Sequence, residues 1–247
     1  MAIKRTFRQL ARFTLLIATF TVAAALAQAQ TSDTGTVTQQ GTVSGYVEVR
    51  AGGVAALANN SGGSITSNKI KGDKLNTPTT MVINFGEVGP ANAASFVTAT
   101  IPLRLRSNVS YTFKMGAAAI TYGGGTPDAE SVTLADIGFG LTTATRDSGG
   151  GVAAGADTIT ASASGDPTLG ANGSISGATG RYSYVAGHSL ASYTTSTTVL
   201  TGPRIMNAMS PNANTNGLVV TTIIALKPHF FTPGSFSTSV TFTISNP

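Results

Sequence analysis

The chain has 247 residues, and 10% of them are charged, against roughly 25% in an average globular protein. It contains no cysteine, which excludes disulfide bonds, thiolate zinc sites and thiol nucleophiles. Four of its 15 basic residues and none of its 10 acidic residues precede Ala29, which leaves 11 basic against 10 acidic residues in the remainder. Without a basic excess to neutralise phosphates, no nucleic-acid partner is expected.

Residues 1–29 are predicted to be a secretory signal peptide. Lys4, Arg5, Arg8 and Arg12 precede an apolar run that starts at Phe13, and small residues follow in "ALAQAQ". This order of a basic region, an apolar region and an A-x-A-like exit is typical of a signal peptide, and cleavage after Ala27 or after Ala29 fits it. No second long apolar run follows, so we expect no membrane span after signal removal. The mature protein is expected to be secreted, either to the periplasm or to the extracellular cell surface.

Strand patterns begin in residues 30–50. Across residues 36–49 the valines fall on one parity and threonines on the other, which predicts a half-buried strand. Residues 51–80 lose this alternation and contain Gly, Asn, Ser and the cluster "NKIKGDK", which is typical of a loop. The segments "MVINFGEV", "FVTATIPLRLR" and "SNVSYTFKM" alternate again. We expect Arg104 and Arg106 to point outward, and a turn or bulge at Ser107 and Asn108.

A Gly/Ala/Ser-rich insertion at 148–180 is predicted to be either a long loop or a set of short surface hairpins. After it, "GLVVTTIIALKP" is apolar on both faces, which predicts a central buried strand. The last strand, in "PGSFSTSVTFTISNP", places Phe236, Val240, Phe242 and Ile244 on its apolar face. Eight or nine short strands separated by turn residues predict an all-β sandwich over residues 51–247.

Catalytic and metal-binding patterns are weak. His188 is expected to be an exposed loop residue and His229 to pack at a strand end, and "GSISG" has Ile175 where a nucleophile elbow needs serine. Asp128 and Glu130 lie in a Gly-rich turn that either binds calcium or is stabilised by these carboxylates, and no EF-hand spacing supports calcium. We therefore predict no catalytic residue, no metal and no cofactor, and a protein that is not an enzyme.

Two segments carry a resemblance to a known family. "INFGEVGPANAASFVTATIPLRLRSNVSYTFKMG" and "TPGSFSTSVTFTIS" resemble parts of secreted spore-coat-U-type and chaperone–usher pilin-like subunits. The resemblance implies an immunoglobulin-like sandwich that lacks one strand, which the N-terminal segment of a neighbouring subunit supplies by β-strand addition. It also implies copies of the same or related subunits, and a periplasmic chaperone, as partners. The cysteine pair common in that family is absent, and the insertion at 148–180 has no counterpart in it.

The resemblance assigns subunit-interaction residues to both partners. The inserted side chains would be those of Val37, Val43, Val47 and Val49, and the groove would be lined by Phe236, Val240, Phe242 and Ile244. This implies a secreted structural subunit of a surface or fimbria-like assembly. Two alternatives remain open at this level. In the first, residues 36–49 are simply the first strand of a complete sandwich. In the second, the chain is a self-contained binding module for glycans that uses the region from Tyr182 to Tyr193.

Overall fold

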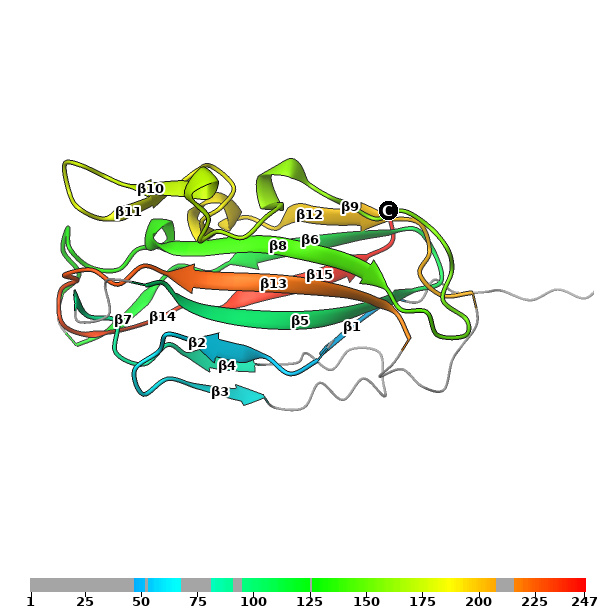
Figure 1. Cartoon of the computed structure of the whole chain (residues 1–247), viewed down its shortest axis with the longest axis horizontal. Coiled ribbons are helices and arrows are strands. Elements are labelled where there is room, and N and C mark those ends of the chain that lie inside the picture. Colours follow the sequence, from blue (N-terminus) through cyan, green and yellow to red (C-terminus); the bar gives the residue numbers. More distant parts are fainter. Residues whose placement is uncertain (1–46, 52, 68–80, 91–94, 125, 208–215) are drawn as a thin grey trace, which may run out of the picture. The chain divides into compact units, whose positions relative to one another are not determined.

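A computed structural model of the chain describes residues 47–51, 53–67, 81–90, 95–124, 126–207 and 216–247 (Figure 1). All of these residues belong to one compact unit, Ser44–Pro247. Within them, every strand ladder is antiparallel, and the helices are four short 3-10 turns. The all-β fold predicted from the alternating patterns is confirmed.

The larger sheet has five strands in the order β1-β5-β13-β8, with β2 pairing along the same side of β5 as β1. These strands are β1 (Val47–Ala51), β2 (Ala56–Ala58), β5 (Val97–Ser107), β8 (Ile137–Arg146) and β13 (Leu218–Leu226). Strand β13 pairs with β5 on one side and with β8 on the other over its whole length. The prediction that this apolar segment forms a central, buried strand is therefore correct.

The second sheet has four strands in the order β15-β6-β12-β9. They are β6 (Tyr111–Ala117), β9 (Thr158–Ile159), β12 (Thr197–Gly202) and β15 (Val240–Ser245). Strand β6 follows β5 after a tight turn, in which the Ser107 hydroxyl donates to the Val109 carbonyl at 2.6 Å and accepts from its N–H. This turn lies where the sequence predicted one, and it carries the chain from one sheet to the other.

The two sheets pack as a sandwich around one apolar core. Phe139 of the five-stranded sheet and Phe242 of the four-stranded sheet meet with ring centroids 6.4 Å apart. The inward rows of β5, β6, β8, β12 and β13 supply most of the other buried side chains of this core. Together the two sheets hold nine strands, which agrees with the eight or nine expected, and the other strands of the described residues form small ribbons.

Three two-stranded ribbons and the 3-10 helices decorate the sandwich. The ribbons pair β3 (Ser64–Ser67) with β4 (Met81–Asn84), β7 (Thr121–Gly123) with β14 (Ser235–Ser237), and β10 (Gly173–Ile175) with β11 (Tyr182–Tyr184). The helices are η2 (Leu134–Asp136), η3 (Ala161–Ala163), η4 (Gly170–Asn172) and η5 (Leu190–Tyr193). The Gly/Ala/Ser-rich insertion at 148–180 thus holds short elements, including one strand of the β10–β11 hairpin.

Arg104 and Arg106 lie on the outer face of β5, as predicted, but they are not exposed to solvent as residues of an outer face would be. Both lie on the outer row of β5, yet they are only 8% and 5% exposed. Arg104 pairs with Asp147 at 3.1 Å, and Arg106 pairs with Glu48 of β1 at 3.3 Å. The strand pattern correctly predicted the face, but it could not show that each guanidinium has a carboxylate partner, which permits burial of a charge.

Candidate assembly interface

Strand β15 presents one apolar and one polar face, as its sequence predicts. Thr241 and Thr243 are exposed, whereas Ile244 is 9% exposed and belongs to the core. The Phe242 ring stacks on Phe113 of β6 with centroids 5.7 Å apart and an interplanar angle of 7°. Phe236, Val240 and Phe242 pack against the core but stay partly exposed. The predicted last strand is divided in the structure: Val240, Phe242 and Ile244 share the inward face of β15, whereas Phe236 lies in β14, which pairs with β7.

The backbone of β15 forms the edge of the four-stranded sheet. In the part of the chain that the structure describes, β15 pairs with β6 and with no other strand. The Ala118 N–H donates to the Ser239 carbonyl at 2.9 Å, where β14 leads into β15. Because antiparallel pairs alternate, odd-numbered residues from Ser239 onward direct their backbone groups to β6. Val240, Phe242 and Ile244 consequently direct their N–H and C=O groups to the open edge.

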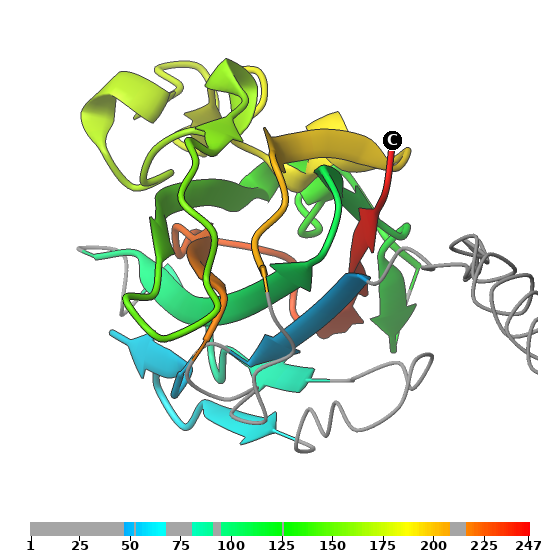
Figure 2. The same ribbon diagram turned by 90° about the vertical axis from the view of Figure 1, so that its right-hand side faces the viewer.

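Strand β1 lies beside β15 on this side of the sandwich (Figure 2). It is the outer strand of the five-stranded sheet and pairs with β5 of the same chain, with Val47 opposite Ser107 and Val49 opposite Leu105. The side chain of Val49 is partly buried against the core. Within the described residues, neither β1 nor β15 pairs with a strand on its outer side, and we call the side of the sandwich where these two edges lie the open side.

The predicted interaction residues are only partly placed by the structure. Val240, Phe242 and Ile244 lie on one face of β15, whereas Phe236 lies in β14 and packs separately against the core. Val47 and Val49 lie in β1, where they pair with β5 of the same chain. Val37 and Val43 lie outside the described residues. The pairing of Glu48 with the buried Arg106 holds β1 in place, and the alternating pattern alone carried no signal for this contact.

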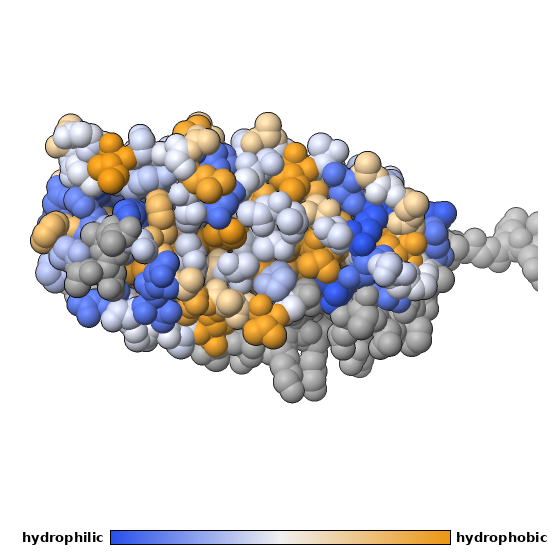
Figure 3. All heavy atoms as spheres, in the orientation of Figure 1, coloured by the Kyte–Doolittle hydropathy of each residue, from blue (hydrophilic) through white to orange (hydrophobic). Residues whose placement is uncertain are grey.

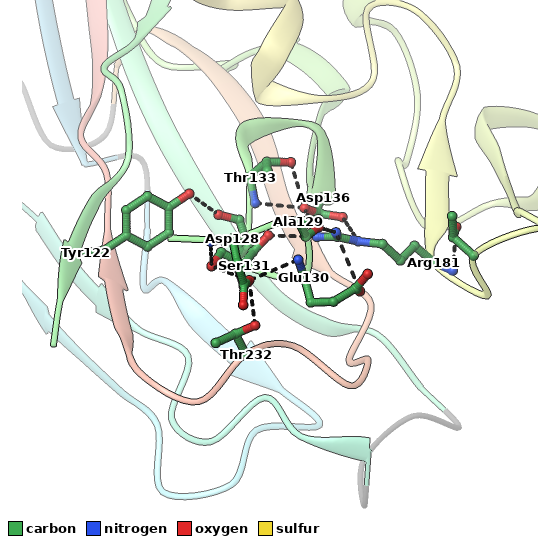
Figure 4. A network of polar contacts seen from close by, with 11 residues as sticks. Tyr122, Asp128, Ala129, Glu130, Ser131, Thr133, Asp136, Arg181 and Thr232 are labelled. Carbon is green, nitrogen blue, oxygen red and sulfur yellow. Dashed lines mark hydrogen bonds and ion pairs between the residues drawn. The ribbon is translucent and has the colours of Figure 1, made fainter. Parts of the chain in front are cut away.

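The carboxylates considered for calcium binding stabilise a turn (Figure 4). Asp128 Oδ1 accepts hydrogen bonds from Thr232 Oγ1 at 2.6 Å, from Ser131 Oγ at 3.1 Å and from the Glu130 N–H at 3.0 Å. The bond from Thr232 is the main cause that lowers the pKa of Asp128 below its ordinary value. Within the described residues, no three His, Asp or Glu side chains are grouped to hold a metal ion.

Arg181 organises the same region and was missed at the level of sequence. Its guanidinium donates to both oxygens of Asp136, at 3.1 and 2.7 Å, and to the carbonyls of Ala129 and Ser131 (Figure 4). A lone arginine directly after an insertion with few charges is a signal for such a buried pair, since a buried cation among small neutral residues needs a partner. Because the guanidinium donors of Arg181 bond to these acceptors, the network holds two segments of the chain together and is not an open binding site.

The tyrosines proposed for glycan binding are packed against the sandwich. Tyr193 is 1% exposed and donates to the Gly187 carbonyl at 2.6 Å, and Tyr184 donates to the Ala225 carbonyl at 3.2 Å. Tyr182 is partly buried and meets Phe96 edge-on, with centroids 4.8 Å apart. Burial raises the pKa of all three phenols, that of Tyr193 to about 12. None of these rings is an open platform for a sugar.

The histidine predictions are corrected in part. His188 is 5% exposed, so the expectation of an exposed loop histidine is wrong; its backbone carbonyl accepts from the Phe139 N–H, which draws the residue against β8. His229 is partly buried and contacts the rings of Phe230 and Phe231. The Nδ1 atom of His188 is buried and has no hydrogen-bond partner among the described residues.

Exposed apolar side chains are scattered over the described surface. Figure 3 shows apolar residues dispersed among polar ones on the face that carries β5, β8 and β13. The large apolar side chains with more than half of their area exposed are Val54, Leu169, Ile175, Val185 and Phe230, and they come from different loops and ribbons. Singly exposed apolar residues are usual on a protein surface, so the open strand edges are the stronger candidate for an interface.

A scan against protein-family models and a search of curated protein sequences both gave no match for this chain. The resemblance to spore-coat-U-type and pilin-like subunits therefore stays a prediction. In the described residues, no helix combines the length and the apolar character needed to cross a membrane.

Proposed function

We propose that the chain is a secreted, non-enzymatic structural subunit of a surface or fimbria-like assembly, joined by β-strand addition. Residues 36–46 of one copy add to the open edge of β15 in the next copy. The observation that carries this proposal is the position of β15. Among the described residues it is the edge strand of its sheet, and its inward residues Val240 and Phe242 are only partly buried.

The donated segment is chosen for its pattern and its length. Val37 and Val43 share one parity, and Thr36, Thr38 and Thr42 share the other. An added strand with this alternation directs valines toward the partly covered side chains of β15 and continues the threonine face of the sheet. Eleven extended residues span about 36 Å, which exceeds the length of the six-residue β15.

The chain enters the sandwich at the end where β15 finishes. Val47 lies opposite Ser107 at the end of β5, and Ser245 lies opposite Thr112 at the start of β6. Only a tight turn separates these two positions of β5 and β6. The amino end of β1 therefore lies near the carboxyl end of β15, the strand to which, in a neighbouring copy, we propose that residues 36–46 add.

The proposal places the donated segment before β1, which narrows the expectation that all four valines are inserted. Val47 and Val49 already pair with β5, and their removal would separate Glu48 from the buried Arg106. Removing one partner of such a pair is costly, because the other charge is left buried.

An open edge also allows incorrect strand pairing before assembly, so a periplasmic chaperone that covers β15 is the partner we propose for export.

The test compares two matched double variants of the full protein. Val37→Lys with Val43→Lys places charges on the parity that would face the groove, and Thr38→Lys with Thr42→Lys adds the same charges on the other parity. We expect the valine variant to stay monomeric and the threonine variant to assemble like the unchanged protein, as measured by sedimentation velocity and light scattering. Deleting residues 28–50 is a poorer test, because it also removes β1 from its own sheet.

Two results would count against the proposal. Assembly that survives the paired valine substitutions would show that residues 36–46 do not bind in the groove. An unchanged protein that is monomeric at every concentration and unfolds cooperatively would mean that the sandwich is complete without a partner strand. That second result would favour a self-contained binding module.

A further inference from the structure

The side of the sandwich opposite the open side carries a second strand edge. Strand β8 is the outer strand of the five-stranded sheet and spans ten residues, Ile137–Arg146. Left bare, such an edge presents a row of N–H and C=O groups to which any other strand can pair. Unlike the edge of β15, this edge is partly covered by other segments of the same chain.

Backbone contacts from the loops on both sides of the β10–β11 hairpin cover the β8 edge. The Phe139 N–H donates to the His188 carbonyl at 3.0 Å, and the Gly165 N–H donates to the Leu141 carbonyl at 2.9 Å. Two isolated bridges, Gly138 with Ser189 and Leu141 with Ser164, mark the same contacts. Two short pieces of chain thus occupy pairing positions that an incoming strand would need.

The same segment also closes the neighbouring edge of the four-stranded sheet. Thr158 and Ile159 form β9, which pairs with Thr201 and Leu200 of β12, and the Thr160 N–H donates to the Val199 carbonyl at 3.0 Å. One continuous stretch, residues 157–189, therefore runs from the edge of one sheet to the edge of the other. We call this stretch the edge guard.

Two glycines of β8 make room for the edge guard on the outer face of the sheet. A Cβ on Gly138 would lie 2.5 Å from the Tyr184 ring, whose hydroxyl bonds to the Ala225 carbonyl of β13. A Cβ on Gly140 would lie 2.0 Å from the Gly165 carbonyl oxygen. Any larger residue at these two positions would therefore push the guard away from the strand that it covers.

The guard is also fixed at its start by a charged clamp. Arg146, the last residue of β8, donates to both oxygens of Asp157 at 2.7 and 2.8 Å, and Tyr111 of β6 donates to Asp157 at 2.7 Å. The Asp157 side chain is 4% exposed, so this clamp is nearly dry. It joins β8, β6 and the first residue of the guard in one hydrogen-bonded group.

We propose that the edge guard blocks self-association through β8, so that a second copy of this chain can add its strand only at the open side. Displacing the guard exposes β8 and lets two copies pair edge to edge. The claim that assembly is restricted to β15 rests on the proposed function. The claim that an uncovered β8 pairs with a second copy does not depend on it.

The experiment displaces the guard from each side of one contact. Gly140→Val changes β8, and Gly165→Ala changes the guard, where the positive φ of +119° disfavours any residue with a Cβ. Gly170→Val is the matched control, because a Cβ there meets nothing within 4 Å. Each substitution is made in the full chain and also in the chain that carries Val37→Lys and Val43→Lys.

We expect both guard variants, and not the control, to gain dimers and larger species, with at least a doubling of the weight-average mass in sedimentation. The gain should persist when Val37 and Val43 are lysine, because it uses another edge. Circular dichroism confirms the fold, and hydrogen exchange at the Phe139 amide reports whether the guard has opened. If Gly140→Val does not fold, Gly165→Ala decides alone, because it leaves β8 unchanged.

Folded guard variants that stay monomeric overturn the proposal, whether or not the Phe139 amide is still protected. If the Phe139 amide were still protected, the glycine contact would not be what holds the guard in place. If the amide were exposed, the uncovered edge of β8 would not pair with another copy. Failure of the proposed function has a different signature, since the unchanged protein would then be monomeric while the guard variants still associate.

Discussion

Thr222 interrupts an otherwise apolar inward row of β13. Leu218, Val220, Ile224 and Leu226 on the same row are buried in the core, and Thr222 itself is 0% exposed. Its hydroxyl finds no hydrogen-bond partner among the described residues, and it lies at the irregularity where the register between β13 and β8 shifts. A buried hydroxyl without a partner costs about 1–3 kcal/mol of desolvation.

We therefore expect Thr222→Val to raise the free energy of unfolding by about 1–2 kcal/mol, measured by urea denaturation. Thr221→Val is the control, since the Thr221 hydroxyl accepts from Thr143 at 2.9 Å on the outer face and should give no gain. A loss of stability in Thr222→Val would contradict the assignment and point to a buried water that satisfies the hydroxyl.

The buried tyrosines predict how stability depends on alkaline pH. Burial raises the pKa of Tyr193 to about 12, and burial is also the main cause of the raised pKa of Tyr111 and Tyr184. In the unfolded chain these phenols have a pKa of about 10. Above that pH the folded state holds more protons than the unfolded state, so the stability present below pH 10 falls as pH rises.

We expect the free energy of unfolding to decline above about pH 10 by up to about 1.4 kcal/mol per pH unit for each such group. Urea denaturation from neutral to alkaline pH measures the decline, and tyrosinate absorbance shows which phenols ionise. Tyr193→Phe should make the decline shallower, although it also removes the hydrogen bond to Gly187. Ionisation of every phenol at ordinary pH in a protein that stays folded would refute the burial of these side chains.

At the level of elements, β15 and β8 show two ways of handling a strand edge. In both strands alternate side chains face the core, and both carry exposed threonines. Each strand is also the outermost strand of its sheet in the described residues. The edge guard covers β8 through backbone contacts near Phe139 and Leu141, whereas in the described residues β15 is hydrogen-bonded to β6 alone. Hydrogen bonding at the edge, rather than side-chain composition, separates the two strands.

A proline at the open edge tests which backbone groups of β15 are available. Val240→Pro removes an N–H that points to the open edge, so we expect the fold to persist and assembly to fail. Thr241→Pro removes an N–H on the β6 side, opposite Gly116, and should lower stability by about 1–3 kcal/mol. Thermal unfolding and sedimentation on both variants measure these effects, and normal assembly of Val240→Pro would exclude strand addition at this edge.

At the scale of the whole sandwich, as far as the described residues show it, the edge of β8 is covered and that of β15 is not. The surface of the sandwich carries few charges, and in the described residues its larger apolar groups are dispersed, so sheet edges are its most directional features. A subunit with a single usable edge and one strand to donate can build a linear chain, because each copy then has one donor and one acceptor. A second bare edge would allow branching, which the edge guard is placed to prevent.

The sequence by itself determined the all-β class, the inward and outward parity of β5, β6 and β15, and the central position of β13. Each of these follows from a period of two in side-chain character, which neighbouring residues carry among themselves. The apolar residues Phe236, Val240, Phe242 and Ile244 were identified in the same way.

Only the tertiary structure decided which edges are open, because strand order depends on contacts between residues far apart in the chain. It joined Glu48 to Arg106, Asp157 to Arg146 and Asp136 to Arg181, pairs whose members are separated by intervals that no local pattern encodes. It also showed that the Gly/Ala/Ser-rich insertion lies across the edge of β8. The sequence alone offered no reason for glycine at positions 138 and 140 of β8, whereas in the fold the Tyr184 ring and the Gly165 carbonyl approach these positions too closely for a Cβ.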